Sequence, residues 1–208
     1  MDPNRDAQRE HERSGARIRA FFALALDAAP RRAAAACTRA LSARPGGDGV
    51  RWVREENLHV TLRFLGNVDP ARVPDLMCCV RAETRRVGPF CLRLGSTGWF
   101  PSERHPRVVA LGLEPPVPVE SLADAVERGV VAAGFPPEAR PFHAHLTLGR
   151  VAKRSARRLD VTGSDTGETE AWSVTEAVLF RSELQRSGAR YTPLECAPLG
   201  AAGGSDHP

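Results

Sequence analysis

Short apolar and β-branched runs alternate along this chain with a few segments of helical spacing. Strands are predicted where apolar residues run together between turn residues, at 18–26, 50–53, 58–65, 90–94, 108–113, 142–151, 172–180 and 189–194. Gly66 is expected to end the strand at 58–65, and a loop with Gly98, Pro101 and Pro106 should follow the strand at 90–94. The last two strands form a predicted hairpin around Ser187 and Gly188.

Three segments have the spacing of helices with one buried face. The first begins after Asp27, a suitable N-cap, and the second begins at Asp69–Pro70, with proline at the first helical position. The third covers 120–133, with Gly134 just past its end. The polar stretch 152–170 predicts a long loop. Many strands with only three helices predict an α+β fold in which helices cover sheets on one side.

The most distinctive pattern is a tetrapeptide that occurs twice, as His59-Val60-Thr61-Leu62 and His145-Leu146-Thr147-Leu148. Side chains two residues apart in a strand point to the same face, so each copy offers one imidazole and one hydroxyl to the same cavity. The two histidines are 86 residues apart. This spacing is compatible with two similar half-domains whose motif strands meet at a central cleft.

Two imidazoles and two hydroxyls around one anionic group suit phosphoryl transfer without a metal. To hydrolyse a strained cyclic phosphodiester, a water must lose a proton as it attacks phosphorus, and the leaving ribose oxygen must gain one on the opposite side. Histidine, with an unperturbed pKa of about 6.5, can serve in either role. The hydroxyls of Thr61 and Thr147 can stabilise charge on the non-bridging oxygens. One His-x-Thr is weak evidence, and the hypothesis depends on the second copy.

Strand parity selects among the basic residues. Arg63 shares the odd-numbered face with His59 and Thr61, so it is predicted to project toward the same cavity and contact phosphate, the alternative being an edge position facing solvent. Arg150 has the opposite parity from His145, unless a bulge near Gly149 re-aims it. The sequence leaves two positions open for the Arg150 side chain, namely the cleft and the back face of the strand.

Other candidate residues have competing interpretations. His143 and His145 form a His-x-His pair that resembles two metal ligands, but no supporting cluster accompanies it, so His143 either lines the cleft or sits at the strand entrance. His105 is predicted to be solvated in the loop 103–107. Trp99 and Phe100 either stack on a base or seal a core. The remaining assignments are Phe64 and Leu65 as core residues, and His11 and His207 as residues of the mobile ends.

Composition sets the broad class. The chain has 208 residues, of which 42% are hydrophobic and 26% charged, as in soluble globular proteins. It lacks an apolar run of membrane-spanning length and a signal-peptide core, and its five cysteines are an odd number without metal spacing, so a cytoplasmic location is expected. The net charge is +4, almost all from arginine, which suits phosphate but not a broad duplex-binding surface. Mobile ends are predicted at 1–16 and 200–208 around one domain at 17–199.

In the residues around the two motifs, the chain resembles the 2H phosphoesterase superfamily. It is most similar to the bacterial and archaeal RNA 2′,3′-cyclic phosphodiesterases, historically called 2′-5′ RNA ligases. The resemblance extends from about Arg17 to Leu199. It rests on the ordered segments 19–24, 56–66, 106–112, 140–150 and 188–194, which are more specific together than the tetrapeptides alone.

The resemblance implies a bilobal, pseudo-twofold α+β fold with two antiparallel sheets around a central cleft and helices outside. By position, His59 matches the proton donor to the leaving oxygen and His145 the proton acceptor that activates water, while Thr61 and Thr147 match the phosphate-binding hydroxyls. The reaction would open a terminal 2′,3′-cyclic phosphate on RNA, such as a tRNA fragment, to a 2′-phosphomonoester. No metal or nucleotide cofactor is expected.

A monomer without an obligate protein partner is expected. The resemblance also associates the family with joining RNA ends through a 2′-5′ linkage. One segment departs from the pattern. The stretch 152–170 is short and loop-like where relatives are expected to carry a further helix, which affects one cleft wall.

Two alternatives stay open. The chain could be a 2H esterase for small cyclic nucleotides or 2′-5′ phosphodiesters. It could instead be a non-catalytic module that holds an RNA end, although binding alone does not need two titrating groups.

Overall fold

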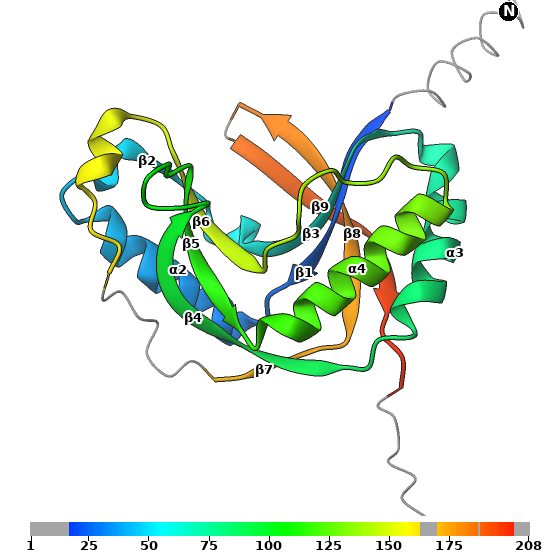
Figure 1. Ribbon diagram of the computed structural model, residues 1–208. Helices are drawn as coiled ribbons and strands as arrows, with labels where there is room; N and C mark the ends of the chain where they lie inside the picture. Colours follow the sequence, from blue (N-terminus) through cyan, green and yellow to red (C-terminus); the bar gives the residue numbers. More distant parts are fainter. Residues whose placement is uncertain (1–16, 163–169, 187, 202–208) are drawn as a thin grey trace, which may run out of the picture.

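A computed structural model describes residues 17–162, 170–186 and 188–201 of the chain (Figure 1). The predicted mobile end at 1–16 and most of the one at 200–208 lie outside these residues, as do His11 and His207. The strands are β1 (Ile18–Ala25), β2 (Val50–Trp52), β3 (His59–Val68), β4 (Phe90–Phe100), β5 (Val108–Glu114), β6 (His145–Val151), β7 (Trp172–Val174), β8 (Glu176–Gln185) and β9 (Gly188–Pro198). The α-helices are α2 (Ala28–Ser42), α3 (Val73–Thr84) and α4 (Pro116–Ala132).

The strands form two antiparallel sheets, which confirms the predicted α+β class. The first sheet has the order β3-β1-β8-β9, and the second has the order β2-β6-β5-β4-β7. A strand, a helix and a motif strand follow one another twice, as β1, α2 and β3 and as β5, α4 and β6, with β2 inserted only in the first series. In each case the two strands pair antiparallel. Each half of the chain therefore supplies one motif strand, in a different sheet.

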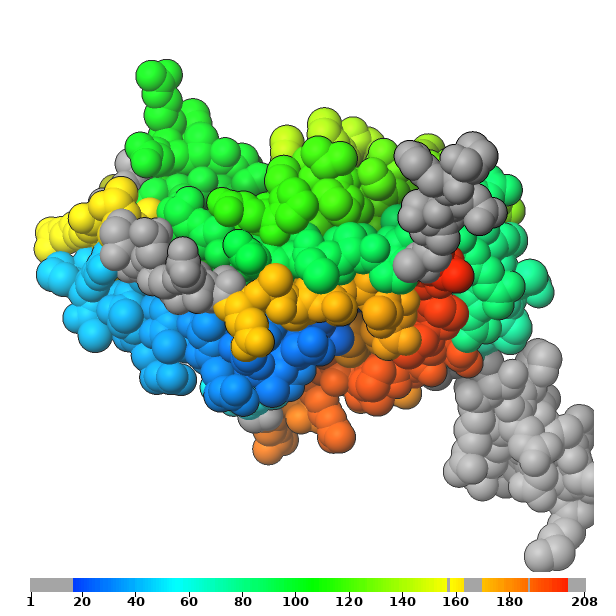
Figure 2. Space-filling view, turned by 90° about the horizontal axis from the view of Figure 1, so that it is seen from below, coloured from blue at the N-terminus to red at the C-terminus, as the bar shows by residue number. Residues whose placement is uncertain are grey.

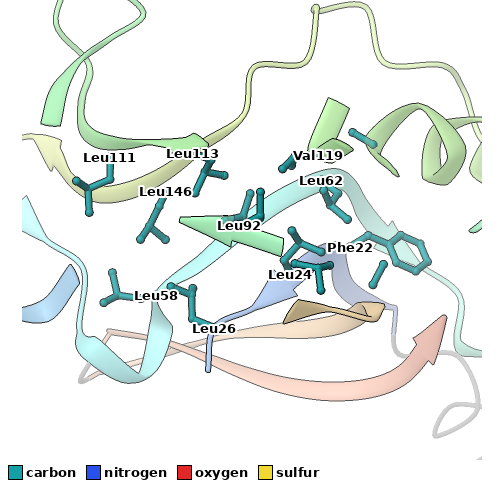
Figure 3. Packing of buried hydrophobic residues seen from close by; sticks show 14 of the residues in the cluster. Phe22, Leu24, Leu26, Leu58, Leu62, Leu92, Leu111, Leu113, Val119 and Leu146 are labelled. Atoms are coloured by element: carbon teal, nitrogen blue, oxygen red, sulfur yellow. The ribbon is translucent and has the colours of Figure 1, made fainter. Parts of the chain in front are cut away.

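Helices pack on the sheet face away from the cleft. Helix α2 contacts β2, β4 and β6 of the second sheet, whereas α4 contacts β3 and α3 contacts β9 of the first sheet. One continuous apolar core joins the two sheets, and Figure 3 shows Leu24 and Leu62 of the first sheet approaching Leu92 and Leu146 of the second. Among the described residues, no helix is long and apolar enough to span a membrane.

The two sheets are interlaced by the path of the chain. It passes from the first sheet to the second between β1 and β2, returns between β2 and β3, crosses again between β3 and β4, and returns between β7 and β8. The last of these crossings is a single residue, Thr175. Figure 2 shows orange surface from the C-terminal part of the chain in contact with both the blue N-terminal segment and the green middle of the chain.

Several strands run further than the sequence suggested. Strand β3 does not stop at Gly66 but passes through it to Val68, because Gly66 adopts a φ of 70° beside a shift in the β1–β3 register. Strand β4 continues through Gly98 to Phe100, since it pairs with β5 along this length. The predicted strand 172–180 is divided at Thr175 into β7 and β8, which belong to different sheets.

The segments around the helices also differ in detail. Asp69 caps a 3-10 turn, Pro70–Arg72, through its Oδ1, which accepts from the Ala71 amide at 2.9 Å, and α3 begins only after that turn. Within the predicted loop 152–170 the structure has one short 3-10 helix, Arg154–Arg158, and residues 163–169 lie outside the described part. In the described part of this loop, no α-helix takes the place that α3 occupies after β3.

The close packing of α3 against α4 predicts that Gly129→Ala destabilises the protein. A Cβ added at Gly129 would lie 2.5 Å from the Cα of Val80 in α3, so the two helices would have to move apart. We expect the free energy of unfolding to fall by about 1 to 3 kcal/mol, measured by urea denaturation.

Gly88→Ala is the matched control, since a Cβ there meets nothing within 4 Å. It should change the unfolding free energy by less than about 0.5 kcal/mol. Equal stability of the two variants would contradict the inferred helix contact.

Candidate active site

The two motif strands contact each other where the sheets meet. In β3 the side chains of Val60 and Leu62 are buried in the shared core, and in β6 those of Leu146 and Leu148 are. The alternating residues, His59 with Thr61 and His145 with Thr147, are half-buried on the opposite faces of their strands. The parity predicted from the tetrapeptides therefore holds in both copies.

His59 is held by both of its ring nitrogens. Its Nδ1 lies 2.7 Å from the carbonyl oxygen of Asn57, and its Nε2 lies 2.9 Å from the hydroxyl of Thr61. Phe21 packs against the imidazole with ring centroids 4.9 Å apart, and Tyr191 contacts it edge-on at 5.1 Å. When Nδ1–H donates to the backbone carbonyl, Nε2 is the nitrogen left to exchange a proton through the cleft.

His145 is anchored in the same manner. Its Nδ1 lies 2.8 Å from the carbonyl oxygen of His143, two residues earlier, as Asn57 is two residues before His59. Phe100 stacks on the imidazole, with centroids 4.5 Å apart and an interplanar angle of 16°. Phe100 therefore packs against one face of the His145 ring. The ring of His143 lies edge-on to Phe100 at 5.7 Å.

To act as a metal site, the pair His143 and His145 would need at least a third ligand nearby. Among the residues that the structure describes, no group of three or more His, Cys, Asp or Glu side chains could hold a metal ion. All five cysteines carry free thiols. The role of His143 here is to hold His145 through its backbone carbonyl.

Burial and charge act on both histidines in the same direction. Burial in the cleft lowers the pKa of His59 and of His145 below the ordinary histidine value, and in each case the backbone hydrogen bond at Nδ1 partly opposes it. The positive charge of Arg150 lowers the pKa of both rings further. One guanidinium thus lowers the pKa of both rings, in keeping with the contact between the two motif strands.

A β-bulge explains why Arg150 faces the cleft despite its even number. In the β5–β6 pairing Val109 faces Gly149 and Ala110 faces Thr147, so Leu148 is an extra residue. The strand bends there, and the face of each later residue is inverted. A Cβ on Gly149 would lie 2.5 Å from Val50 on the core side, which leaves Arg150 on the opposite, cleft side.

The equivalent bulge in β3 overturns the prediction for Arg63. Phe22 pairs with Arg63 and Ala23 with Thr61, so Leu62 is the extra residue and Arg63 shares the core-side face of Phe22. Its guanidinium forms ion pairs with Glu127 of α4 and with Glu138, and it donates to the Pro136 carbonyl at 2.6 Å. The prediction that Arg63 projects into the cavity is wrong, because parity counts fail across a bulge.

Phe64 changes sides for the same reason. It was expected in the core, but it pairs with Phe21 on the cleft face and is 43% exposed. Leu65, the other core prediction, is partly buried and packs against the core as expected. Phe64 and Arg150 thus follow their motif histidines by the same number of residues and occupy equivalent cleft positions, one in each sheet.

Arg51 is a cleft residue that the sequence analysis missed. It lies directly opposite Arg150 in the β2–β6 ladder, and its neighbours Val50 and Trp52 pack toward the core, so it faces the cleft. Two arginines directly opposite each other repel, and within the described ranges neither has an ion pair recorded. Such a pair is suited to an anion between the two side chains. The alternation Val50-Arg51-Trp52 was the available signal.

Comparisons with known proteins show the family to which the chain belongs. The model of the family described as LigT like Phosphoesterase matches residues 24–110 and 111–191. The chain is 34% identical over 184 residues to the RNA 2′,3′-cyclic phosphodiesterase of Methanothermobacter thermautotrophicus, covering 86% of this chain and 97% of that protein. It is 36% identical over 147 residues to the Escherichia coli protein of the same name, covering 70% and 77%.

Solved structures give the same result for the fold. The crystal structure of E. coli LigT complexed with 3′-AMP has a TM-score of 0.69 to this chain at 31% identity. The similarity covers 88% of this chain and 98% of that one. The two-sheet arrangement with its three helices is therefore shared with solved phosphoesterases over most of the chain.

The shared influence of Arg150 predicts that Arg150→Gln raises the pKa of both His59 and His145. Removing the positive charge makes protonation of each ring less unfavourable, so both titrations should move to higher pH. The titrations can be followed by NMR of the ring C–H signals.

Arg32→Gln, at an exposed position of α2, removes the same charge from the surface and should leave both titrations in place. A shift of only one histidine in the Arg150 variant would contradict the shared influence of Arg150.

Proposed function

The chain belongs to the LigT-like phosphoesterase family, and on that premise we propose that it hydrolyses terminal 2′,3′-cyclic phosphates of RNA to 2′-phosphomonoesters by two-histidine acid–base catalysis. The observation that carries the proposal is that the two motif strands contact each other and hold His59 with Thr61, and His145 with Thr147, on their faces away from the core. The related proteins named RNA 2′,3′-cyclic phosphodiesterase support the same substrate class.

In the proposed reaction the cyclic phosphate lies between the motif strands. His145, neutral because burial lowers its pKa, takes the proton from water at Nε2 as the oxygen attacks phosphorus. His59, as an imidazolium, gives a proton from Nε2 to the ribose oxygen that leaves on the opposite side. The new P–O bond forms as the old one breaks, and the phosphate remains attached to the 2′ oxygen.

The remaining groups stabilise charge and orientation. Arg150 and the hydroxyls of Thr61 and Thr147 are proposed to bind the non-bridging oxygens, where negative charge is concentrated. The carbonyls of Asn57 and His143 keep Nδ1 of each ring occupied, so that Nε2 faces the reacting atoms. Proton transfer and charge stabilisation are thus each assigned to a side chain, which supports a metal-independent mechanism.

The decisive assay is product analysis in excess EDTA on one oligonucleotide that ends in a 2′,3′-cyclic phosphate. We expect the wild-type protein to give a 2′-phosphate, and His59→Ala and His145→Ala each to lower kcat by roughly 100-fold or more, because each removes one proton-transfer group.

His105→Ala is the control, since His105 is an exposed loop residue outside both tetrapeptides, and its kcat should be unchanged. Loss of wild-type turnover on chelation would contradict the metal-independent mechanism. Tight binding of RNA that is recovered unchanged would favour an end-binding module instead.

A second prediction concerns pH. The active form needs His59 protonated and His145 neutral, and both pKa values are lowered in the free protein. The plot of kcat/KM should therefore reach its maximum below pH 6.5 and fall as pH rises, as protonated His59 is lost. Bound anionic phosphate favours the imidazolium, so the kcat profile should lie at higher pH than the kcat/KM profile.

The two apparent pKa values in such profiles belong to the coupled pair rather than to single residues. A kcat/KM that is constant from pH 6 to 8 would contradict the assignment.

A further inference from the structure

A cavity of about 330 Å³ opens beside His59 on the cleft face of the first sheet. Strands β1, β8 and β9 form its floor, and the segment before β3 forms one wall. Its lining residues include Phe21, Arg31, His59, Glu176, Phe180 and Tyr191. The mechanism proposed above uses His59 but leaves the rest of this cavity without a role.

Aromatic rings line the cavity next to the reacting group, with Phe180 and Tyr191 partly exposed and Phe21 buried. Phe180 stacks on Phe21, with centroids 5.6 Å apart and an interplanar angle of 19°, and Tyr191 stands edge-on to Phe21 at 5.0 Å. His59 contacts both Phe21 and Tyr191. A planar group that entered beside His59 would therefore meet aromatic rings fixed by their contacts with one another.

Polar groups complete the lining. Arg31 is held by a hydrogen bond of 2.5 Å from its Nη2 to the Leu26 carbonyl, and in the described part of the chain no carboxylate is paired with it. The carboxylate of Glu176 accepts from the thiol of Cys196 at 3.3 Å. The cavity thus offers one set of hydrogen-bond donors and one set of acceptors, which is what the edge of a nucleobase requires.

The chemistry of the reaction decides which part of the substrate lies here. In an in-line displacement the leaving ribose oxygen is opposite the attacking water, so the ribose and its base lie on the side of the proton donor. That side is the side of His59. On the other side, Phe100 covers the ring of His145, and Arg51 and Arg150 occupy the cleft face.

We propose that this cavity is the subsite for the base of the nucleotide that carries the cyclic phosphate. The base stacks in the aromatic part of the lining, and Arg31 and Glu176 meet its polar edge. The proposal rests on the proposed function, because it uses His59 as the proton donor.

The test compares two oligonucleotides that end in a 2′,3′-cyclic phosphate, one on an ordinary nucleoside and one on a ribose without a base. We expect the wild-type kcat/KM to be roughly tenfold or more higher on the base-bearing end, the scale of one base–aromatic stack. Phe180→Ala should lower kcat/KM strongly on the base-bearing end and hardly at all on the abasic end.

Phe135→Ala is the matched control. Phe135 packs under the guanidinium of Arg72, which lies 4.2 Å from its ring centroid, and it does not line the cavity, so its loss should affect both substrates equally and slightly. Should Phe180→Ala fail to fold, Arg31→Gln leaves the aromatic wall intact, and its loss of kcat/KM should likewise be confined to the base-bearing end.

The outcomes separate the two proposals. Equal wild-type rates on both ends, or a Phe180→Ala defect of the same size on both, would overturn the base subsite while leaving the hydrolase function in place. If the wild-type protein turned over neither substrate, the proposed function itself would be refuted.

Discussion

Burial of four aliphatic side chains, Val60, Leu62, Leu146 and Leu148, is the constraint on which the cleft depends. They come from the two motif strands and enter one core that joins both sheets. In a strand the side-chain period is two, so a slip of one residue would bury an imidazole and a hydroxyl in place of two aliphatic groups. The apolar residues of each tetrapeptide therefore fix the register, and the histidines and threonines face the cleft as a consequence.

The sequence carried enough information for the fold class and for the four motif residues, because both follow from local periodicity. It could not locate the two bulges, which depend on pairing with β1 and β5. These bulges account for the reversed positions of Arg63 and Phe64, and they resolve the divided prediction for Arg150. The sequence also did not reveal the separation of β7 from β8. The run 172–180 looks like one strand, but its two parts belong to different sheets.

The two halves are similar in path but differ in chemistry. The second residue after the bulge is Phe64 in β3 and Arg150 in β6. Further aromatic rings surround His59, whereas Arg51 adds a second guanidinium beside Arg150. One wall is thus apolar and the other basic. In the proposed reaction the donor His59 thus lies on the aromatic side of the cleft, and the acceptor His145 lies on the side that carries the two arginines.

The interlaced path of the chain has a consequence for how a substrate enters. Two lobes joined by a single linker can swing apart, but here four separate crossings join the sheets, and one of them is a single residue, Thr175. Rigid-body opening would strain all four connections and divide the shared core. The aperture of the cleft is consequently set when the chain folds. Expulsion of water from the cleft therefore does not come from two lobes swinging shut, and a bound group has to displace the water by filling the cleft.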